Sequence, residues 1–376
     1  MNKTYSINLF KPKIYEESIE AVTEVLRSGW TGLGPKTKKF ENDFSKYVNS
    51  KYAVGMNSAT SALHLAMKLI NLKEGDEIIT SPITFVSTNH AILYEKGVPV
   101  FADVQKDTIN IDPEDIKRKI TKKTKAIICV HFGGYPCDMD EIHKIARDYD
   151  LYVIEDCAHA TGSSYKGQKI GSISSINCFS FHSVKNLSIC DGGAITTNSE
   201  LYNDRLKKLR WLGINKSTHD RTKEDGKEKS IIYSWKYDVD EIGYKYHMND
   251  IMASIGIEQL KYVEKDNDRR REIASIYNEG LRNIDGIELL NYKDDRITSR
   301  HLYVMKVDRR DKLIMHLKNN GIAPGVHYLR NDYYNMYDKT HLSNVDEIQD
   351  KIISLPLHLH LTNEEVEYVI NTIKKF

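Results

Sequence analysis

The sequence predicts an α/β fold, in which a large domain with a mostly parallel seven-stranded sheet flanked by helices precedes a smaller C-terminal α+β domain. Between residues 51 and 197, short β-rich runs alternate with helical stretches whose apolar residues recur at three- and four-residue spacing. Such alternation favours parallel strands covered by helices on both faces. The length of 376 residues also favours two domains, which we place at 1–250 and 251–376.

The individual elements follow from these patterns. Strands are expected at residues 52–56, 77–81, 98–104, 125–131, 151–156, 176–181 and 193–197. Helices are expected between them at 62–70, 86–95, 113–120 and 139–148. Further on we expect a long helix over 251–281 that runs through a broken, charge-rich middle at 265–271, a run typical of a solvated helix face. We also expect a strand over 301–307 and helices over 311–319 and 363–375. The polar stretch 216–230 predicts an exposed loop.

The composition argues against several classes of function. Apolar residues make up 40% and charged residues 28%, with a net charge of +1, as in ordinary globular proteins. Without a dense basic stripe, nucleic acid and an anionic membrane are not expected as partners. No signal-peptide core or membrane-spanning apolar run occurs, so we expect a cytoplasmic protein. The five cysteines form no CxxC pair and predict neither a disulfide framework nor a metal site.

Candidate chemistry begins at Lys185, which follows the expected strand 176–181 and precedes Asp191-Gly192-Gly193. One interpretation is a lysine that surfaces at a loop. The other is a Schiff-base lysine, whose amine must be unprotonated and close to a carbonyl cofactor. Taken alone, the residue does not decide between them.

The strand over 151–156 ends in Glu155-Asp156. These acids are either solvated at the end of the strand or, beside a pyridine cofactor, one of them holds the ring nitrogen protonated so that the ring acts as an electron sink. Asp156 is better placed for that role than Glu155. His159 follows one helical turn later and is either structural or in contact with the cofactor.

Small and hydroxyl residues over 55–62 lead from the first strand into a helix, with Thr60 and Ser61 among them. The N-terminus of a helix offers backbone N–H groups and its positive dipole end to a phosphate. The alternative is an ordinary N-cap by Ser58 or Thr60. Phe85, after the second strand, either stacks on a planar ring or packs in the core.

In their order and spacing these residues resemble the DegT/StrS family of sugar aminotransferases, a branch of the fold-type-I pyridoxal-phosphate (PLP) enzymes. The resemblance runs from about Ile7 to the C-terminus. The segments that carry it are 29–34, 57–66, 82–86, 130–140, 155–162, 179–185, 191–194, 243–250 and 327–328.

The resemblance implies a PLP-dependent aminotransferase and assigns roles to matching positions. Lys185 would hold the cofactor covalently and, once displaced, move the proton between the α-carbon of the donor and the cofactor. Asp156 would bind the pyridine nitrogen. Phe85 and His159 would flank the ring.

The phosphate would be held by Thr60, the Ser61 backbone and Ser180. In the family, the segment that corresponds to 243–249 reaches the phosphate from the neighbouring subunit, so the resemblance implies a homodimer with shared active sites. The family's usual contact there is an Asn, and in this chain Lys245 and His247 occupy the candidate positions.

The resemblance also implies small-molecule substrates: an amino donor, glutamate, and a keto sugar acceptor, a nucleotide-linked 3-keto or 4-keto deoxyhexose of the kind used in polysaccharide biosynthesis. The residues expected near the substrate are Trp30, Thr31, His327, Tyr328 and Arg330. Arg330 either pairs bidentately with an anionic group or is a solvated loop residue.

The family commonly shows His-Tyr-x-Pro-x-His where this chain has residues 327–332, HYLRND. This departure leaves the acceptor open, and a smaller phosphorylated ketone is the first alternative. A regulatory protein that keeps the fold without catalysis is the second.

Overall fold

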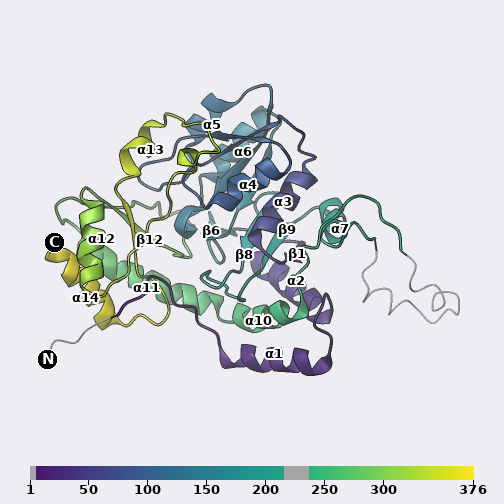
Figure 1. Ribbon diagram of the computed structural model, residues 1–376, viewed down its shortest axis with the longest axis horizontal. Helices are drawn as coiled ribbons and strands as arrows, with labels where there is room; N and C mark the ends of the chain where they lie inside the picture. The colour runs from purple at the N-terminus through teal and green to yellow at the C-terminus, as the bar shows by residue number, and fades with distance from the viewer. Residues whose placement is uncertain (1–5, 216–236) are drawn as a thin grey trace.

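The central feature of the computed structural model, which describes residues 6–215 and 237–376, is a seven-stranded sheet (Figure 1). Its strand order is β1-β9-β8-β5-β4-β2-β3. The pairs from β8 to β3 are parallel, whereas β9 runs antiparallel to β1 and to β8. The strands are β1 (Tyr52–Met56), β2 (Glu77–Thr80), β3 (Val98–Phe101), β4 (Thr124–Val130), β5 (Tyr152–Asp156), β8 (Ile176–Ser180) and β9 (Gly193–Thr197). The predicted seven-stranded, mostly parallel sheet is confirmed.

Helices cover both faces of this sheet. They are α1 (Glu16–Ser28), α2 (Pro35–Val48), α3 (Ala59–Leu69), α4 (Val86–Tyr94), α5 (Pro113–Lys119), α6 (Met139–Asp148), α7 (Glu200–Leu209) and α10 (Asp250–Leu260). Along β4 the buried side chains alternate between two cores: Ile127 and Cys129 pack with residues of α2 and α6, and Ala126 and Ile128 pack with residues of α3. A strand with apolar residues on both faces is typical of a sheet covered on both sides.

The remaining elements belong mainly to the C-terminal part, where α12 and α14 gather at the end of the molecule opposite α7 (Figure 1). The helices are α11 (Val263–Leu281), α12 (Arg310–Asn319), α13 (Ser343–Ile348) and α14 (Asn363–Lys374), with short η1 (Phe132–Gly134) and η2 (Asn331–Tyr333). One small sheet contains β10 (Ile287–Leu289), β12 (Tyr303–Val307) and β13 (Ile352–Leu355), and another contains β6 (Ser164–Tyr165), β7 (Gln168–Lys169) and β11 (Arg296–Ile297).

The helices and strands do not test two of the predictions, the domain boundary and the loop over 216–230. The domain boundary at residue 250 stays a prediction, and the loop predicted over 216–230 lies outside the described residues. Within the described ranges, none of the helices has the length and apolar character needed to cross a membrane.

The break predicted at 265–271 within the long helix is misplaced, because the chain breaks at Lys261 and Tyr262, between α10 and α11, and α11 continues through the charge-rich run. The charge-rich run is also not simply a solvated face. Asp266, Asn267 and Arg270 are buried, since this side of α11 packs against the protein interior, where Asn267 donates to the carbonyl oxygen of Thr161 at 3.0 Å.

The expectation for Arg330 is corrected as well, because its side chain is completely buried and does not line the pocket around Lys185. Its Nε and Nη2 donate to the two Asp332 carboxylate oxygens at 2.7 Å each, and its Nη1 pairs with Asp346. Next to it, Asn331 donates its backbone N–H to the Pro82 carbonyl at 2.8 Å. Arg330 therefore anchors this loop and leaves no free face for an anion.

The N-terminus of α2 is capped by a carboxylate that is remote in sequence. Asp250, the first residue of α10, accepts the backbone N–H groups of Gly34, Lys36 and Thr37 at 3.0, 3.0 and 2.8 Å, and the Thr37 hydroxyl at 2.7 Å. These are the N–H groups that a helix start leaves without intrahelical partners. A buried acid thus joins α2 to α10 where a local N-cap is missing, since position 34 is a glycine.

We expect Asp250→Ala to lower the free energy of unfolding by about 2–4 kcal/mol, because it leaves several buried donors without an acceptor. Urea denaturation measures this loss. Asp43→Ala, which removes a surface carboxylate of α2 paired with Lys39, is the matched control and should cost less than about 1 kcal/mol. Equal effects of the two substitutions would contradict the capping role.

Candidate active site

A cavity of about 400 Å³ lies at the carboxyl ends of the parallel strands β4, β5 and β8. This is the edge at which ligands of open α/β sheets bind. The residues predicted from the sequence that line it are Thr60, Phe85, Asp156, His159, Ser180, Lys185, His327 and Tyr328. The structure therefore brings together side chains from five separate segments of the chain.

Asp156 is the last residue of β5 and is buried. Its Oδ2 accepts the Thr88 hydroxyl at 2.8 Å, and its Oδ1 accepts the Ala158 backbone N–H at 3.1 Å. Burial raises the pKa of this carboxyl, whereas these two hydrogen bonds and the nearby Lys185 act to lower it. The wall of the cavity thus presents a carboxylate that is held by two donors.

Lys185 enters the cavity from the loop after β8, where its backbone N–H donates to the His182 carbonyl at 2.8 Å. Burial lowers the pKa of its amine to about 8, and the Asp156 charge only partly opposes this. About a tenth of the amine is therefore unprotonated at pH 7. An amine of this kind is available as a nucleophile and as a base.

Rings border the cavity beside these two groups. The Phe85 side chain is 58% exposed, and its ring lies 6.1 Å from that of Tyr328. The buried His159 ring accepts the Gly133 backbone N–H at Nδ1, 3.3 Å away, so Nε2 carries the hydrogen and faces the Tyr328 hydroxyl at 3.0 Å. Burial, and then the charge of Lys185, lower the pKa of His159 well below its usual value, which keeps the ring neutral.

The start of α3 forms the far end of the cavity. The Ser58 side chain caps the helix by accepting the Ser61 backbone N–H at 3.1 Å, and Ser61 does not line the cavity, so the use of that amide for a phosphate stays a prediction. The amides of Ala59 and Thr60 have no intrahelical partner by helix geometry. A Cβ atom on Gly193 would come within 2.6 Å of the Ala59 nitrogen, so glycine keeps this helix start uncovered.

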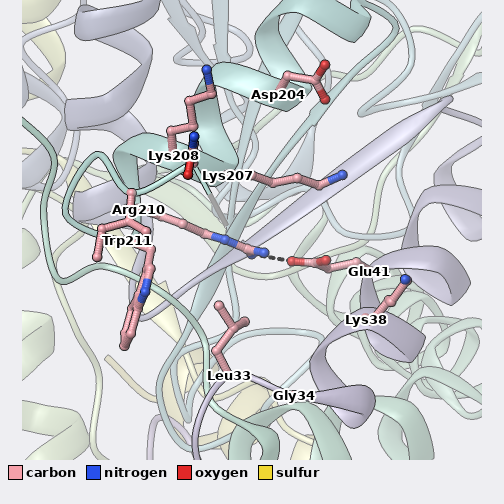
Figure 2. A pocket seen from close by; sticks show the side chains of 11 residues that line it. Leu33, Gly34, Lys38, Glu41, Asp204, Lys207, Lys208, Arg210 and Trp211 are labelled. Atoms are coloured by element: carbon pink, nitrogen blue, oxygen red, sulfur yellow. Dashed lines mark hydrogen bonds and ion pairs between the residues drawn. The ribbon is translucent and has the colours of Figure 1, made fainter. Parts of the chain in front are cut away.

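Four predicted residues, Trp30, Thr31, Lys245 and His247, do not line the cavity around Lys185. Trp30 and Thr31 precede Leu33 and Gly34, which line a second cavity of about 430 Å³ (Figure 2). The wall of that cavity also contains Trp211, whose ring is contacted by Lys245 Nζ at 3.6 Å and by the His247 ring at 4.5 Å. Neither Lys245 nor His247 lines the cavity around Lys185.

The second cavity has a cationic wall (Figure 2). Lys38, Lys207, Lys208 and Arg210 contribute to it, and Arg210 is paired with Glu41. Burial, followed by the charges of Lys245 and Arg210, lowers the pKa of the neighbouring His247 to about 4.

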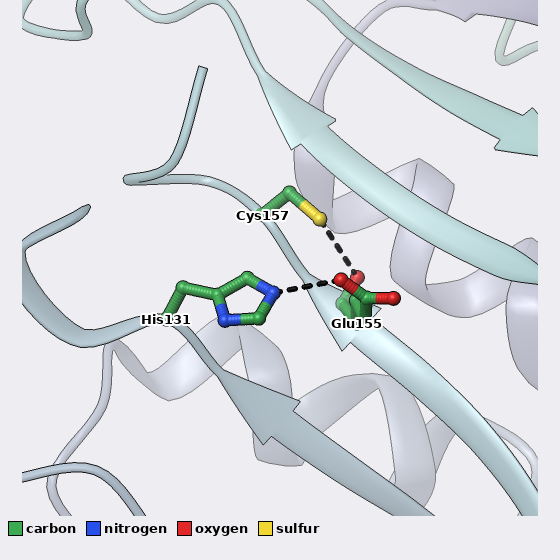
Figure 3. Close-up of side chains that lie close together, drawn as sticks. All are labelled: His131, Glu155 and Cys157. Atoms are coloured by element: carbon green, nitrogen blue, oxygen red, sulfur yellow. Dashed lines mark hydrogen bonds and ion pairs between the residues drawn. The ribbon is translucent and has the colours of Figure 1, made fainter. Parts of the chain in front are cut away.

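A buried His–Glu pair lies below the cavity, with Cys157 beside it (Figure 3). His131 Nδ1 accepts the Cys137 backbone N–H at 3.1 Å, so its Nε2–H donates to Glu155 Oε2 at 2.8 Å. The other Glu155 oxygen accepts the Ser174 backbone N–H at 2.8 Å. Both ring nitrogens of His131 are therefore already used in hydrogen bonds.

Sequence reasoning missed three residues near the reacting groups: Phe10, Thr88 and His301. Thr88 lies four residues after Thr84, a spacing that places both hydroxyls on one side of a turn, and that signal was available. The other two line the cavity from remote segments. No local pattern distinguishes them from core residues.

The groups in the cavity fit PLP. A half-buried amine with a lowered pKa, a hydrogen-bonded carboxylate and an uncovered helix start complement its carbonyl, its ring nitrogen and its phosphate in turn. The exposed face of Phe85 and the neutral ring of His159 suit the faces of a planar ring.

Comparison with known proteins gives the same assignment. Residues 12–374 match the DegT/DnrJ/EryC1/StrS aminotransferase family. The chain is 44% identical to an uncharacterized protein of Methanocaldococcus jannaschii, over 97% of this chain and 96% of that one. It is 38% identical to the spore coat polysaccharide biosynthesis protein SpsC of Bacillus subtilis, over 96% and 95%.

Among solved structures, the PLP form of the putative sugar aminotransferase Spr1654 from Streptococcus pneumoniae superposes with a TM-score of 0.90 at 32% identity, covering 99% of this chain and 98% of that one. The match spans nearly the whole chain, and the cavity holds the groups that the cofactor needs. This chain therefore belongs to the DegT/DnrJ/EryC1/StrS aminotransferase family and is a PLP-dependent aminotransferase.

Proposed function

We propose that this enzyme moves an amino group from glutamate to a keto sugar, and that the sugar is carried on a nucleotide as a 3-keto or 4-keto deoxyhexose. The observation that carries the proposal is the cavity in which the Lys185 amine and the Asp156 carboxylate meet, within a chain similar to a putative sugar aminotransferase and to a polysaccharide biosynthesis protein. A cytoplasmic location is part of the proposal.

Lys185 is the proposed catalytic residue. PLP, when bound, supplies a ring that accepts electrons from the substrate carbon. The Lys185 amine holds the cofactor at rest, and once free it removes a proton from the α-carbon of the donor and delivers it to the cofactor side. An amine with a pKa of about 8 is close to the range in which a group both takes and returns a proton near neutral pH.

Asp156 is proposed to hold the proton on the pyridine nitrogen. A carboxylate at this position favours the protonated ring by charge and by hydrogen bonding. Thr88 and Ala158 donate to its oxygens and so fix the direction in which the carboxylate points. Phe85 and His159 are proposed to flank the ring from its two sides.

The anionic end of the cofactor is proposed to bind at the start of α3. The backbone amides of Ala59 and Thr60, the Thr60 side chain and the hydroxyl of Ser180 are the groups that border the cavity there. Backbone N–H groups at the positive end of a helix dipole favour a phosphate.

The protein is proposed to work as a homodimer with shared active sites. Trp30, Thr31, Lys245 and His247 do not line the cavity that contains Lys185, and Lys245 and His247 instead contact Trp211 in the wall of the second cavity. Lys245 and His247 would approach the phosphate of the neighbouring subunit, and Trp30 and Thr31 would approach its substrate. His327 and Tyr328 would contact the substrate from within their own chain.

Two alternatives, a small phosphorylated ketone as acceptor and a regulatory protein without catalysis, are less well supported. The departure from the family pattern at residues 330–332 fills a buried structural role through Arg330 and Asp332, so it gives no reason to prefer a small phosphorylated ketone. A regulatory protein without catalysis does not explain an amine with a lowered pKa in one cavity with a buried acid.

Acceptor assays test the proposed substrate. With glutamate as donor, kcat/KM should be higher for nucleotide-linked keto sugars than for small phosphorylated ketones, because the larger ligand has more binding energy to use in the transition state. Turnover of the small ketones alone would overturn the sugar assignment while leaving the aminotransferase chemistry intact.

Lys185→Ala should abolish both covalent capture of PLP and transamination, with kcat/KM lower by at least about a thousandfold, because the nucleophile and the base are lost together. Absorbance spectroscopy with borohydride reduction measures the capture. In the wild type the capture rate should rise with pH through about 8, since only the neutral amine attacks. Lys374→Ala, at an exposed lysine of α14, is the control and should behave as wild type.

A mixing experiment tests the shared sites. Lys185→Ala and Lys245→Ala should each be impaired alone, and after dissociation and reassociation of a mixture, part of the activity should return. A mixed dimer places both substitutions in one site and leaves the other site intact. A mixture no more active than the average of its components would show that Lys245 does not act across an interface.

A further inference from the structure

His301 is a buried residue between β11 and β12, and its side chain lines the Lys185 cavity. Its Nε2 lies 3.5 Å from the Lys185 amine nitrogen. The ring is held between two others: His159 lies at 4.4 Å between centroids, and Phe10 stacks on it at 5.9 Å. No role for His301 follows from the chemistry described so far.

The hydrogen bonds around Asn186 define which nitrogen of His301 carries the hydrogen. Asn186 Nδ2 donates to the Ser299 backbone carbonyl at 2.8 Å, an atom that can only accept. The same Nδ2 donates to Asn267 Oδ1 at 2.7 Å. Asn267 is itself oriented, because its Nδ2 donates to the Thr161 carbonyl.

With its Nδ2 used in this way, Asn186 must present its Oδ1 to His301. That oxygen lies 3.1 Å from His301 Nδ1, which is therefore the protonated nitrogen. The remaining nitrogen, Nε2, carries a lone pair and faces Lys185. The side-chain amides of Asn267 and Asn186 therefore fix the tautomer of His301 in which Nε2 accepts a hydrogen bond from the Lys185 amine.

The surroundings keep the imidazole neutral. Burial is the largest cause, and the positive charges of Lys185 and Arg270 act in the same direction, as would any proton taken up by His159 or His327, so the pKa of His301 lies well below its usual value. On the lysine side, Asp156 is the charged group that acts against burial. The contact between the two residues is therefore an N–H of the amine donating to a neutral nitrogen.

We propose that His301 is a positioning residue for Lys185: it accepts one N–H of the free amine at Nε2 and thereby aims the nitrogen lone pair into the cofactor cavity. The proposal rests on the proposed function of Lys185 and deepens it. The acceptor fixes the rotation of an otherwise flexible side chain, and orientation of this kind accelerates attack on a bound carbonyl.

The test uses cofactor-free enzyme and measures the rate at which Lys185 captures added PLP as a function of pH. Two quantities are read: the plateau rate at high pH, where the amine is neutral, and the pH midpoint. Lys185→Ala gives the background. A small amine-reactive label, located by peptide mass spectrometry, gives the same two quantities independently of the cofactor.

For His301→Leu we expect a plateau rate lower by about tenfold, because the orienting acceptor is lost. The midpoint should move downward by up to about one pH unit, because an acceptor that stabilises the ammonium is replaced by an apolar group. His301→Gln, which restores a polar group near Nε2, should recover part of both changes. His316→Leu, at a half-buried histidine of α12 that bonds the Thr372 carbonyl, is the matched control and should change neither.

The outcomes are distinct. A merely structural role for His301 would loosen the pocket, and the midpoint would then rise toward the ordinary lysine value of about 10.4. That result, or a plateau and midpoint unchanged in His301→Leu, would overturn the proposal. Failure of the wild type itself to capture PLP would instead overturn the proposed function.

Discussion

The active site depends on one constraint: the Asp156 carboxylate and the Lys185 amine share one cavity, and burial disfavours the charge of each. Burial raises the pKa of Asp156 and lowers that of Lys185, and each charge partly offsets the burial of the other. Further charges in the same space would add repulsion. Three of the histidines that line the cavity, at 159, 301 and 327, accordingly have lowered pKa values. The cavity thus combines the buried Asp156 carboxyl, the Lys185 amine and neutral hydrogen-bonding rings.

The same constraint separates two adjacent acids. Successive side chains of a strand point to opposite faces, so Asp156 faces the cavity while Glu155 pairs with His131 beneath it (Figure 3). Burial acts to raise the pKa of Glu155, but its hydrogen bonds with His131 and Ser174 outweigh burial and the pKa is lowered. Asp156 therefore faces the cavity, and Glu155 forms a buried pair with His131 on the other face of the sheet.

Most of the large sheet and many of the cavity residues could be predicted from the sequence. Strands such as β1 and β9 carry strong local patterns, and Asp156, Lys185 and Phe85 follow strands whose ends meet at one edge of the sheet. What could not be predicted depends on packing between remote segments. The burial of Arg330 requires Asp346, sixteen residues later, and the contact of His301 with Lys185 spans 116 residues.

The length of the loop that carries Lys185, between β8 and β9, limits which insertions and deletions the active site can accept. Ser180 ends β8, Gly193 begins β9, and the two residues are paired across the ladder. Ser180 lines the cavity and Gly193 lies against the start of α3, so the loop over 181–192, which carries Lys185, starts and ends beside that helix start. The length of the loop therefore sets how far the Lys185 amine lies from the first amides of α3. Insertions or deletions in this loop would shift the amine relative to those amides.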